Sequence, residues 1–124
     1  MAEVVTYQER WRAAFERLNR EWIETWFTLE DADRETFADP AAKIVAPGGQ
    51  IFFVVDGDEV LGTCAVMPHS PEVHEIAKMA VAPDARGRGY GDLLMDACVA
   101  FSRAAFACSW RGRRERRSAA SPTC

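Results

Sequence analysis

The stretch from Arg86 to Gly91 (RGRGYG) constrains this chain most, because three glycines alternate with two arginines and a tyrosine. It follows a strand-like segment, Val73–Val81, and precedes an apolar run of helical spacing that begins at Leu93. Glycine lets the backbone adopt positive φ and lets a ligand approach without a Cβ in the way. A strand, a glycine loop and a helix N-terminus in this order direct several free amides to one point, which suits a phosphate or pyrophosphate.

The spacing of this loop excludes two nucleotide-binding motifs. A P-loop requires Gly-Lys followed by Ser or Thr, and the sequence contains no such run. A dinucleotide fingerprint requires Gly-x-Gly-x-x-Gly, but after Gly87 and Gly89 the required position holds Asp92. The remaining pattern is Arg-x-x-Gly-x-Gly, preceded by a strand that ends in Val-x-Pro.

This pattern resembles the GNAT-type N-acetyltransferases, in which the loop holds the pyrophosphate of acetyl-CoA. The resemblance is carried by residues 78–97 (KMAVAPDARGRGYGDLLMDA), and the order of the upstream segments extends it over about residues 1–105. It implies an acetyl-CoA-dependent N-acetyltransferase that acts on a primary amine of a small molecule or peptide. Acetyl-CoA would be the co-substrate.

The resemblance also implies roles for individual residues. At a bulge in the strand, the backbone of Met79, Ala80 and Val81 would pair with the pantetheine arm, and one N–H would stabilise the oxyanion as the amine attacks. The pyrophosphate would be held by the loop residues Arg86, Gly87, Arg88, Gly89, Tyr90 and Gly91. For Arg88, contact with the 3′-phosphate and a solvated position on the loop are both open.

Acetyl transfer needs a base, because an alkyl amine with a pKa near ~10 is mostly protonated at neutral pH. Relatives often supply a glutamate on the same strand, and Glu75 matches that position best. An ordinary surface carboxylate is the alternative for Glu75. His69 and His74 lack metal-like partners, so we expect no metal site and place both on a loop or strand surface.

In the family, the segment after the first helix lines the groove for the acceptor. Here that segment contains Trp26 and Phe27, followed by the acidic residues Glu30, Asp31 and Asp33. The resemblance therefore implies that these residues contact a cationic amine.

The remaining patterns predict one domain with an α+β (mixed α/β) fold. A helix to about residue 27 is predicted to pack on the sheet through side chains spaced by four, three, four and four positions: Trp11, Phe15, Leu18, Trp22 and Trp26. A short second helix is expected within residues 28–39 and a brief extended segment over 43–45. The β-rich segments are 4–7, 50–55, 59–67 and 73–81, and an Asp-Gly turn joins the second to the third as a hairpin.

Residues 106–124 match no part of the family pattern, which continues with further strands, an Asn, a Tyr and a closing Gly-Phe. That tyrosine usually protonates the departing CoA thiolate, and neither Tyr7 nor Tyr90 is an evident replacement. We expect an acetyltransferase-like domain over residues 1–105, comprising the N-terminal and CoA-loop part without the C-terminal strands. An Arg-rich, disordered tail would follow over residues 106–124.

The charge changes sign within this tail. Residues 1–110 carry a net charge of −8 and residues 111–124 a net charge of +4. A truncated or frame-shifted gene and a real basic tail both explain the change. Phe106, Cys108 and Trp110 alternate, so a short strand is an alternative to disorder there.

Three functions remain open: an active N-acetyltransferase, a non-catalytic acyl-CoA-binding remnant, and a nucleic-acid-binding adaptor that uses the arginines. The acidic body argues against nucleic acid as a partner. No apolar run reaches the ~18 residues of a bilayer span, so we expect no membrane partner. The four cysteines lack zinc-site spacing, which favours free thiols in a reducing cytoplasm. A homodimer is compatible with the sequence, which does not fix the oligomeric state.

Overall fold

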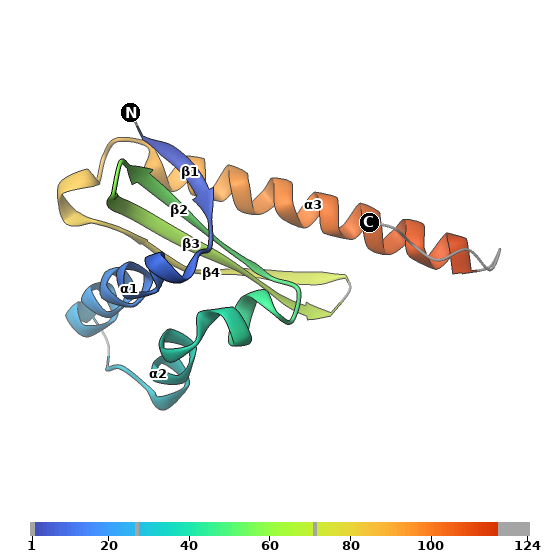
Figure 1. Cartoon of the computed structure of the whole chain (residues 1–124), viewed down its shortest axis with the longest axis horizontal. Coiled ribbons are helices and arrows are strands. Elements are labelled where there is room, and N and C mark those ends of the chain that lie inside the picture. The colour runs from blue at the N-terminus through green and yellow to red at the C-terminus, as the bar shows by residue number, and fades with distance from the viewer. Residues whose placement is uncertain (1, 27, 71, 117–124) are drawn as a thin grey trace.

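The computed structural model describes residues 2–26, 28–70 and 72–116. One antiparallel sheet, in the order β1-β2-β3-β4, carries α1 and α2 on one face and α3 on the other (Figure 1). The strands are β1 (Glu3–Thr6), β2 (Gln50–Asp56), β3 (Glu59–Ser70) and β4 (Val73–Val81), and the α-helices are α1 (Arg12–Trp26), α2 (Asp31–Ala38) and α3 (Tyr90–Arg116). The predicted mixed α/β fold is therefore confirmed.

The β2–β3 hairpin forms where the Asp-Gly turn predicts it. Asp56 pairs with Glu59 across a two-residue loop, and Gly57 has a φ of 63°, which glycine adopts without strain. Because side chains alternate along each strand, this hairpin directs Phe53 to the α1/α2 face and Phe52 to the α3 face.

Aromatic side chains fill the layer between the sheet and the first two helices. Phe15 contacts Phe37 of α2 edge to face, with ring centroids 5.6 Å apart, and Phe53 of β2 at 6.3 Å. Trp11 lies 6.3 Å from the ring of Phe53. Burial of each such side chain contributes roughly 1.5–3 kcal/mol. On the opposite face, α3 buries Leu94 against β2 and β3.

The predicted aromatic stripe is only partly a core face. Trp11, Phe15 and Leu18 are buried, but Trp22 is 43% exposed, so the prediction that it packs on the sheet is wrong. Trp22 instead lines, together with Met79 of β4, a pocket that is described below. The side chain of Trp26 lies outside the described residues.

Residues 43–45 are also not extended. They belong to a wide helical turn, Ala41–Val45, which buries Ile44 in the core. Gly49 closes this turn by donating a backbone hydrogen bond to the carbonyl of Ile44 at 2.9 Å. A Cβ on Gly49 would lie 2.2 Å from the carbonyl oxygen of Val66, so the turn packs on β3 only with glycine here.

The helix α3 continues to Arg116, past the expected domain end at residue 105. The short strand considered for residues 106–110 is therefore wrong, and the backbone of the expected disordered segment is helical over 106–116. Alanine, arginine and glutamate are strong helix formers, which explains this continuation without apolar periodicity. Residues 117–124 lie outside the described part of the chain.

Candidate active site

The glycine loop adopts the backbone conformation that its composition predicts. Gly87 and Gly89 have φ values of 82° and 81°, and a Cβ built on either would meet no atom within 4 Å. Arg86 donates from Nε to the carbonyl of Val81 at 3.2 Å, which fixes the start of the loop to the end of β4. The loop leads directly into α3, which begins at Tyr90.

The amides of this loop fit an anionic ligand. Those of Gly87, Arg88 and Gly89 donate no hydrogen bond to any other described residue. The space around the glycines is open, and the N-terminus of a long helix adds partial positive charge. This geometry suits a phosphate or pyrophosphate, and the binding of acetyl-CoA by residues 86–91 stays a prediction.

A bulge interrupts β4 next to the predicted oxyanion site. Thr63 pairs with Ala80 but Ala65 pairs with Ala77, so Lys78 and Met79 together lie opposite a single residue of β3. Lys78 has a φ of 57°. The bulge thus begins at Lys78, one position before the predicted Met79–Val81 segment.

The bulge also determines on which face of the sheet the following side chains of β4 lie. Met79 and Val81 pack on the α3 side of the sheet and Ala80 packs on the α1/α2 side. Within the described residues β4 pairs only with β3. Its other edge therefore offers backbone N–H and C=O groups for pairing with a ligand.

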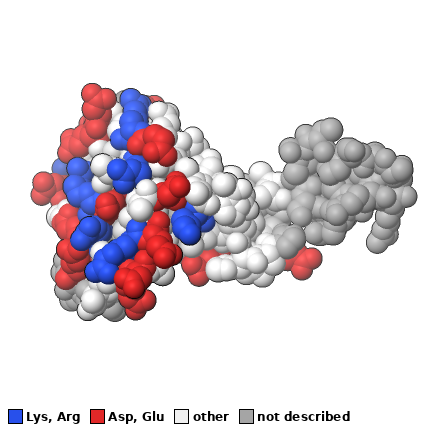
Figure 2. Space-filling view, turned by 60° about the horizontal axis from the view of Figure 1, so that its bottom comes forward, with Lys and Arg blue, Asp and Glu red and all other residues white. Residues whose placement is uncertain are grey.

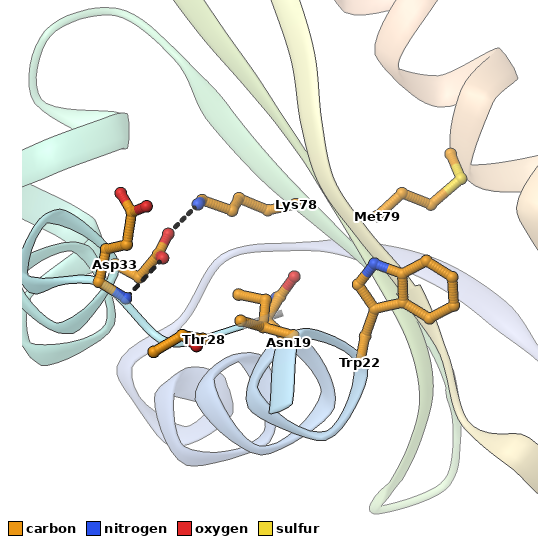
Figure 3. A pocket seen from close by; sticks show the side chains of 8 residues that line it. Asn19, Trp22, Thr28, Asp33, Lys78 and Met79 are labelled. Carbon is orange, nitrogen blue, oxygen red and sulfur yellow. Dashed lines mark hydrogen bonds and ion pairs between the residues drawn. The ribbon is translucent and has the colours of Figure 1, made fainter. Parts of the chain in front are cut away.

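A pocket of about 430 Å³ adjoins this bulge (Figure 3). It lies between α1, the segment after α1, the start of α2 and β4, and its lining residues are Asn19, Trp22, Ile23, Thr28, Glu30, Asp33, Lys78 and Met79. Of the acidic run, Glu30 and Asp33 line the pocket. Asp31 does not line it but pairs with Arg34 at 2.9 Å. Phe27, and the side chain of Trp26, lie outside the described part of the chain.

Asp33 and Lys78 form an ion pair across the pocket, with Nζ of Lys78 2.6 Å from Oδ1 of Asp33. The two side chains are 18% and 21% exposed, respectively. Asp33 also accepts a hydrogen bond from the backbone N–H of Glu30 and so caps α2. The hydrogen bond from Lys78 lowers the pKa of Asp33 below its usual value, although partial burial opposes this shift.

Glu75, the predicted base, projects from the α1/α2 side of β4, because it pairs with Met67, whose side chain packs there. Its carboxylate lies 3.4 Å from Nε2 of His69, and both side chains are about half exposed. Glu75 is not among the residues that line the pocket at Lys78. The catalytic role of Glu75 stays a prediction.

His74 projects to the other face and meets α3. Its Nδ1 lies 3.1 Å from Oγ of Ser102, and its ring lies 4.3 Å from the ring of Phe106. Among the residues that the structure describes, no group of three or more His, Cys, Asp and Glu side chains could hold a metal ion.

Neither tyrosine lines the pocket at Lys78. Tyr90 begins α3 in the glycine loop, and Tyr7 follows β1, where its hydroxyl donates to Glu9 at 3.2 Å. Burial and this hydrogen bond raise the pKa of Tyr7 to about 12.

Sequence reasoning missed Lys78, and with it the ion pair. The available signal was a single charged side chain between Ile76 and Val81, within an otherwise apolar stretch of strand. Asn19 and Thr28 also line the pocket, but their polar side chains carry no distinctive spacing.

The model of the acetyltransferase (GNAT) family matches residues 11–114. The chain belongs to this family. Its members are N-acetyltransferases that use acetyl-CoA and act on amine acceptors, as the loop motif predicts. The match extends past residue 105, so this GNAT chain retains family similarity into the C-terminal part of α3.

Solved structures share the fold. A GNAT-family acetyltransferase from Staphylococcus aureus gives a TM-score of 0.76 at 13% identity, over 84% of this chain and 67% of that one. An acetyltransferase from Streptococcus agalactiae gives 0.73 at 19% identity, over 84% and 67%. A predicted acetyltransferase from Clostridium acetobutylicum, solved with acetyl-CoA, gives 0.69 at 15% identity, over 84% and 75%. No curated protein matches the chain. In the described residues, every helix is too short or too polar to cross a bilayer.

Proposed function

We propose that this GNAT chain transfers the acetyl group of acetyl-CoA to a primary amine of a small molecule or peptide. The observation that carries the proposal is the bulge at Lys78–Met79. It borders the pocket between α1, α2 and β4, and the same strand runs on to the open glycine loop. The strand β4 would thus contact both acetyl-CoA and the amine.

Acetyl-CoA would supply an acetyl thioester as the acyl donor. The amides of Gly87, Arg88 and Gly89 would bind the pyrophosphate, each with about 1.5–3 kcal/mol of net stabilisation. The outer edge of β4 would pair with the pantetheine arm. The backbone N–H of Met79 would donate to the thioester oxygen, where negative charge develops during transfer.

The acceptor would enter the pocket as a cation. Its lining contains two carboxylates, Glu30 and Asp33, and one ammonium, Lys78, so the pocket keeps an excess of negative charge. On the surrounding face, acidic and basic side chains are interleaved (Figure 2) and form exposed pairs such as Arg20–Glu24 at 3.1 Å. The excess of negative charge in the pocket would therefore distinguish it from this mixed surface. That mixed surface, in the described part of the chain, does not resemble a nucleic-acid interface.

Glu75 would accept the proton of the amine through a chain of water molecules. Met79 lies four positions further along β4, or roughly 13 Å of extended chain, which is too far for direct transfer, so several water molecules would be needed. His69, whose Nε2 lies 3.4 Å from the carboxylate, would then contact the base.

A second candidate function is binding of an acyl-CoA without transfer. It is favoured by the placement of the two tyrosines, neither of which lines the pocket to protonate a thiolate. A loop that holds the pyrophosphate would still bind the nucleotide part of CoA.

Release of CoA thiol, followed with a thiol reagent, distinguishes the two functions. The assay would contain acetyl-CoA and, in turn, polyamines, aminoglycosides, amino acids and peptides with a free N-terminus. Release that depends on one amine class supports the enzyme, and mass spectrometry should find the acetylated amine. Binding of acetyl-CoA without release for any amine would leave the acyl-CoA-binding function.

A further inference from the structure

Lys78 has a backbone conformation that L-residues rarely adopt. Its φ of 57° lies in the left-handed region, and it is the one non-glycine residue with positive φ in the described part of the chain. Steric contact between Cβ and the following carbonyl makes this region unfavourable for lysine. Bulges that need a left-handed residue commonly use glycine for this reason.

The side chain of Lys78 is held by contacts that offset this strain. Its ammonium lies 2.6 Å from Asp33 and 5.7 Å from the centre of the Phe37 ring. Asp33 is itself fixed, because its other oxygen accepts from the N–H of Glu30 at 3.3 Å. Lys78 is therefore fastened to the first turn of α2, 45 residues earlier in the chain.

We propose that the Asp33–Lys78 pair positions the Met79 amide for acetyl transfer. The orientation of the peptide group between Lys78 and Met79 depends on the backbone angles of Lys78, which the ion pair holds in the left-handed region. Asp33 and Lys78 are positioning residues, since they act through this amide. The inference rests on the proposed function, in which that amide donates to the thioester oxygen.

A largely buried ion pair is poor evidence for stability alone, because desolvation offsets most of the attraction. A role in selecting one backbone conformation fits the observations better. Figure 3 shows Lys78 reaching from the strand to Asp33 while the side chain of Met79 leaves the strand in another direction. The bulge separates these two directions, so a change at Lys78 would move the neighbouring amide.

The first test needs no acetyl-CoA. The HN–Hα coupling and the backbone chemical shifts of Lys78, measured by NMR on the free chain, report its φ directly. In Asp33→Asn we expect these values to move toward those of extended backbone, with a shift of the Met79 amide resonance. Glu24→Gln, which removes the exposed pair with Arg20, should leave both residues unchanged. Unchanged Lys78 values in a folded Asp33→Asn chain would overturn the proposal.

The second test compares two substitutions of Lys78 that both remove the ion pair. Glycine adopts positive φ without strain and alanine does not. We therefore expect Lys78→Gly to retain a kcat roughly tenfold above that of Lys78→Ala, with similar KM for acetyl-CoA. If the pair only stabilised the fold, Lys78→Gly would have the same or lower kcat, and that result would contradict positioning.

The two tests separate this inference from the proposed function. If the wild-type chain transfers no acetyl group, the proposed function fails, and the NMR comparison still decides whether Asp33 sets the backbone of Lys78. Transfer can also occur while the NMR values of Lys78 are unchanged in Asp33→Asn and kcat of Lys78→Gly does not exceed that of Lys78→Ala. In that case only the positioning role fails.

Discussion

Nδ1 of His74 lies 3.1 Å from Oγ of Ser102, which joins the first residues of β4 to the middle of α3. Ser102 is buried, and the ring of Phe106 covers the imidazole at 4.3 Å. The strand that carries the bulge and the helix that begins at the glycine loop are thus also joined away from that loop. This contact is therefore a second attachment of α3 to β4, besides the loop that connects them.

Removal of the Ser102 hydroxyl should therefore destabilise the fold. We expect Ser102→Ala to lower the free energy of unfolding by about 0.5–1.5 kcal/mol, because the partly buried ring nitrogen of His74 loses its hydrogen-bond partner. Urea unfolding measures the change. Ser70→Ala, at the exposed β3–β4 turn, serves as a control and should change the value by less than about 0.5 kcal/mol. Equal effects for the two variants would mean that the His74 contact contributes nothing specific.

Gly89→Ala should weaken the binding of acetyl-CoA. The substitution forces an L-residue to a φ of 81°, at a cost of about 1–2 kcal/mol, or else moves the amides of the loop. Gly57→Ala is a matched control, because Gly57 also has positive φ and open space around it but lies in the β2–β3 turn. Calorimetric titration should show weaker binding for Gly89→Ala alone. Equal affinities for all three chains would argue against the loop as the binding site.

Glu75→Gln tests the base. General-base catalysis contributes roughly 10²–10⁴-fold, so kcat at neutral pH should fall by a factor in this range. The rate of the variant should rise with pH as the free amine becomes available. Glu72→Gln removes the same charge three positions earlier and should leave the pH profile unchanged. If the pH profile of Glu75→Gln overlays that of the wild type, Glu75 is a surface carboxylate with no role as the base.

The pH dependence of stability should reveal the Asp33–Lys78 pair. The hydrogen bond from Lys78 lowers the pKa of Asp33 from 3.8, so the folded state binds this proton less readily than the unfolded state. The contribution is therefore fully present above about pH 4 and is lost as the pH falls through the lowered pKa. The free energy of unfolding of the wild type should fall more steeply below about pH 4 than that of Asp33→Asn. If the free energies of unfolding of the two chains change with pH in parallel, the Asp33–Lys78 pair does not form in solution.

Local chemistry made much of the fold predictable. The Asp-Gly turn and the glycine loop each have a direct backbone cause, and the structure places both where the sequence does. The exposure of Trp22 was not predictable, because helical spacing does not show that a pocket lies between α1 and β4. The turn over residues 41–45 depends on close packing of Gly49 against β3, which periodicity also does not report.

The candidate site was predictable where it depends on backbone and less so where it depends on distant side chains. The positive φ of Gly87 and Gly89 could be predicted from composition, whereas the binding of a pyrophosphate by residues 86–91 is implied by the family resemblance and stays a prediction. The pairing of Asp33 with Lys78 joins segments 45 residues apart, and no local pattern connects them. The partner of Glu75 was hidden for the same reason, since the β3–β4 register decides that His69 is nearby.

The central claim is that the glycine loop and the bulged edge of β4 together bind acetyl-CoA. Titration of the ¹⁵N-labelled chain with acetyl-CoA, followed by amide chemical shifts, tests it most directly. Saturable shifts are expected at Gly87 to Gly91 and at Met79 to Val81, with little change at Gly57. Shifts confined to other segments, or no shifts at a large excess of acetyl-CoA, would contradict it.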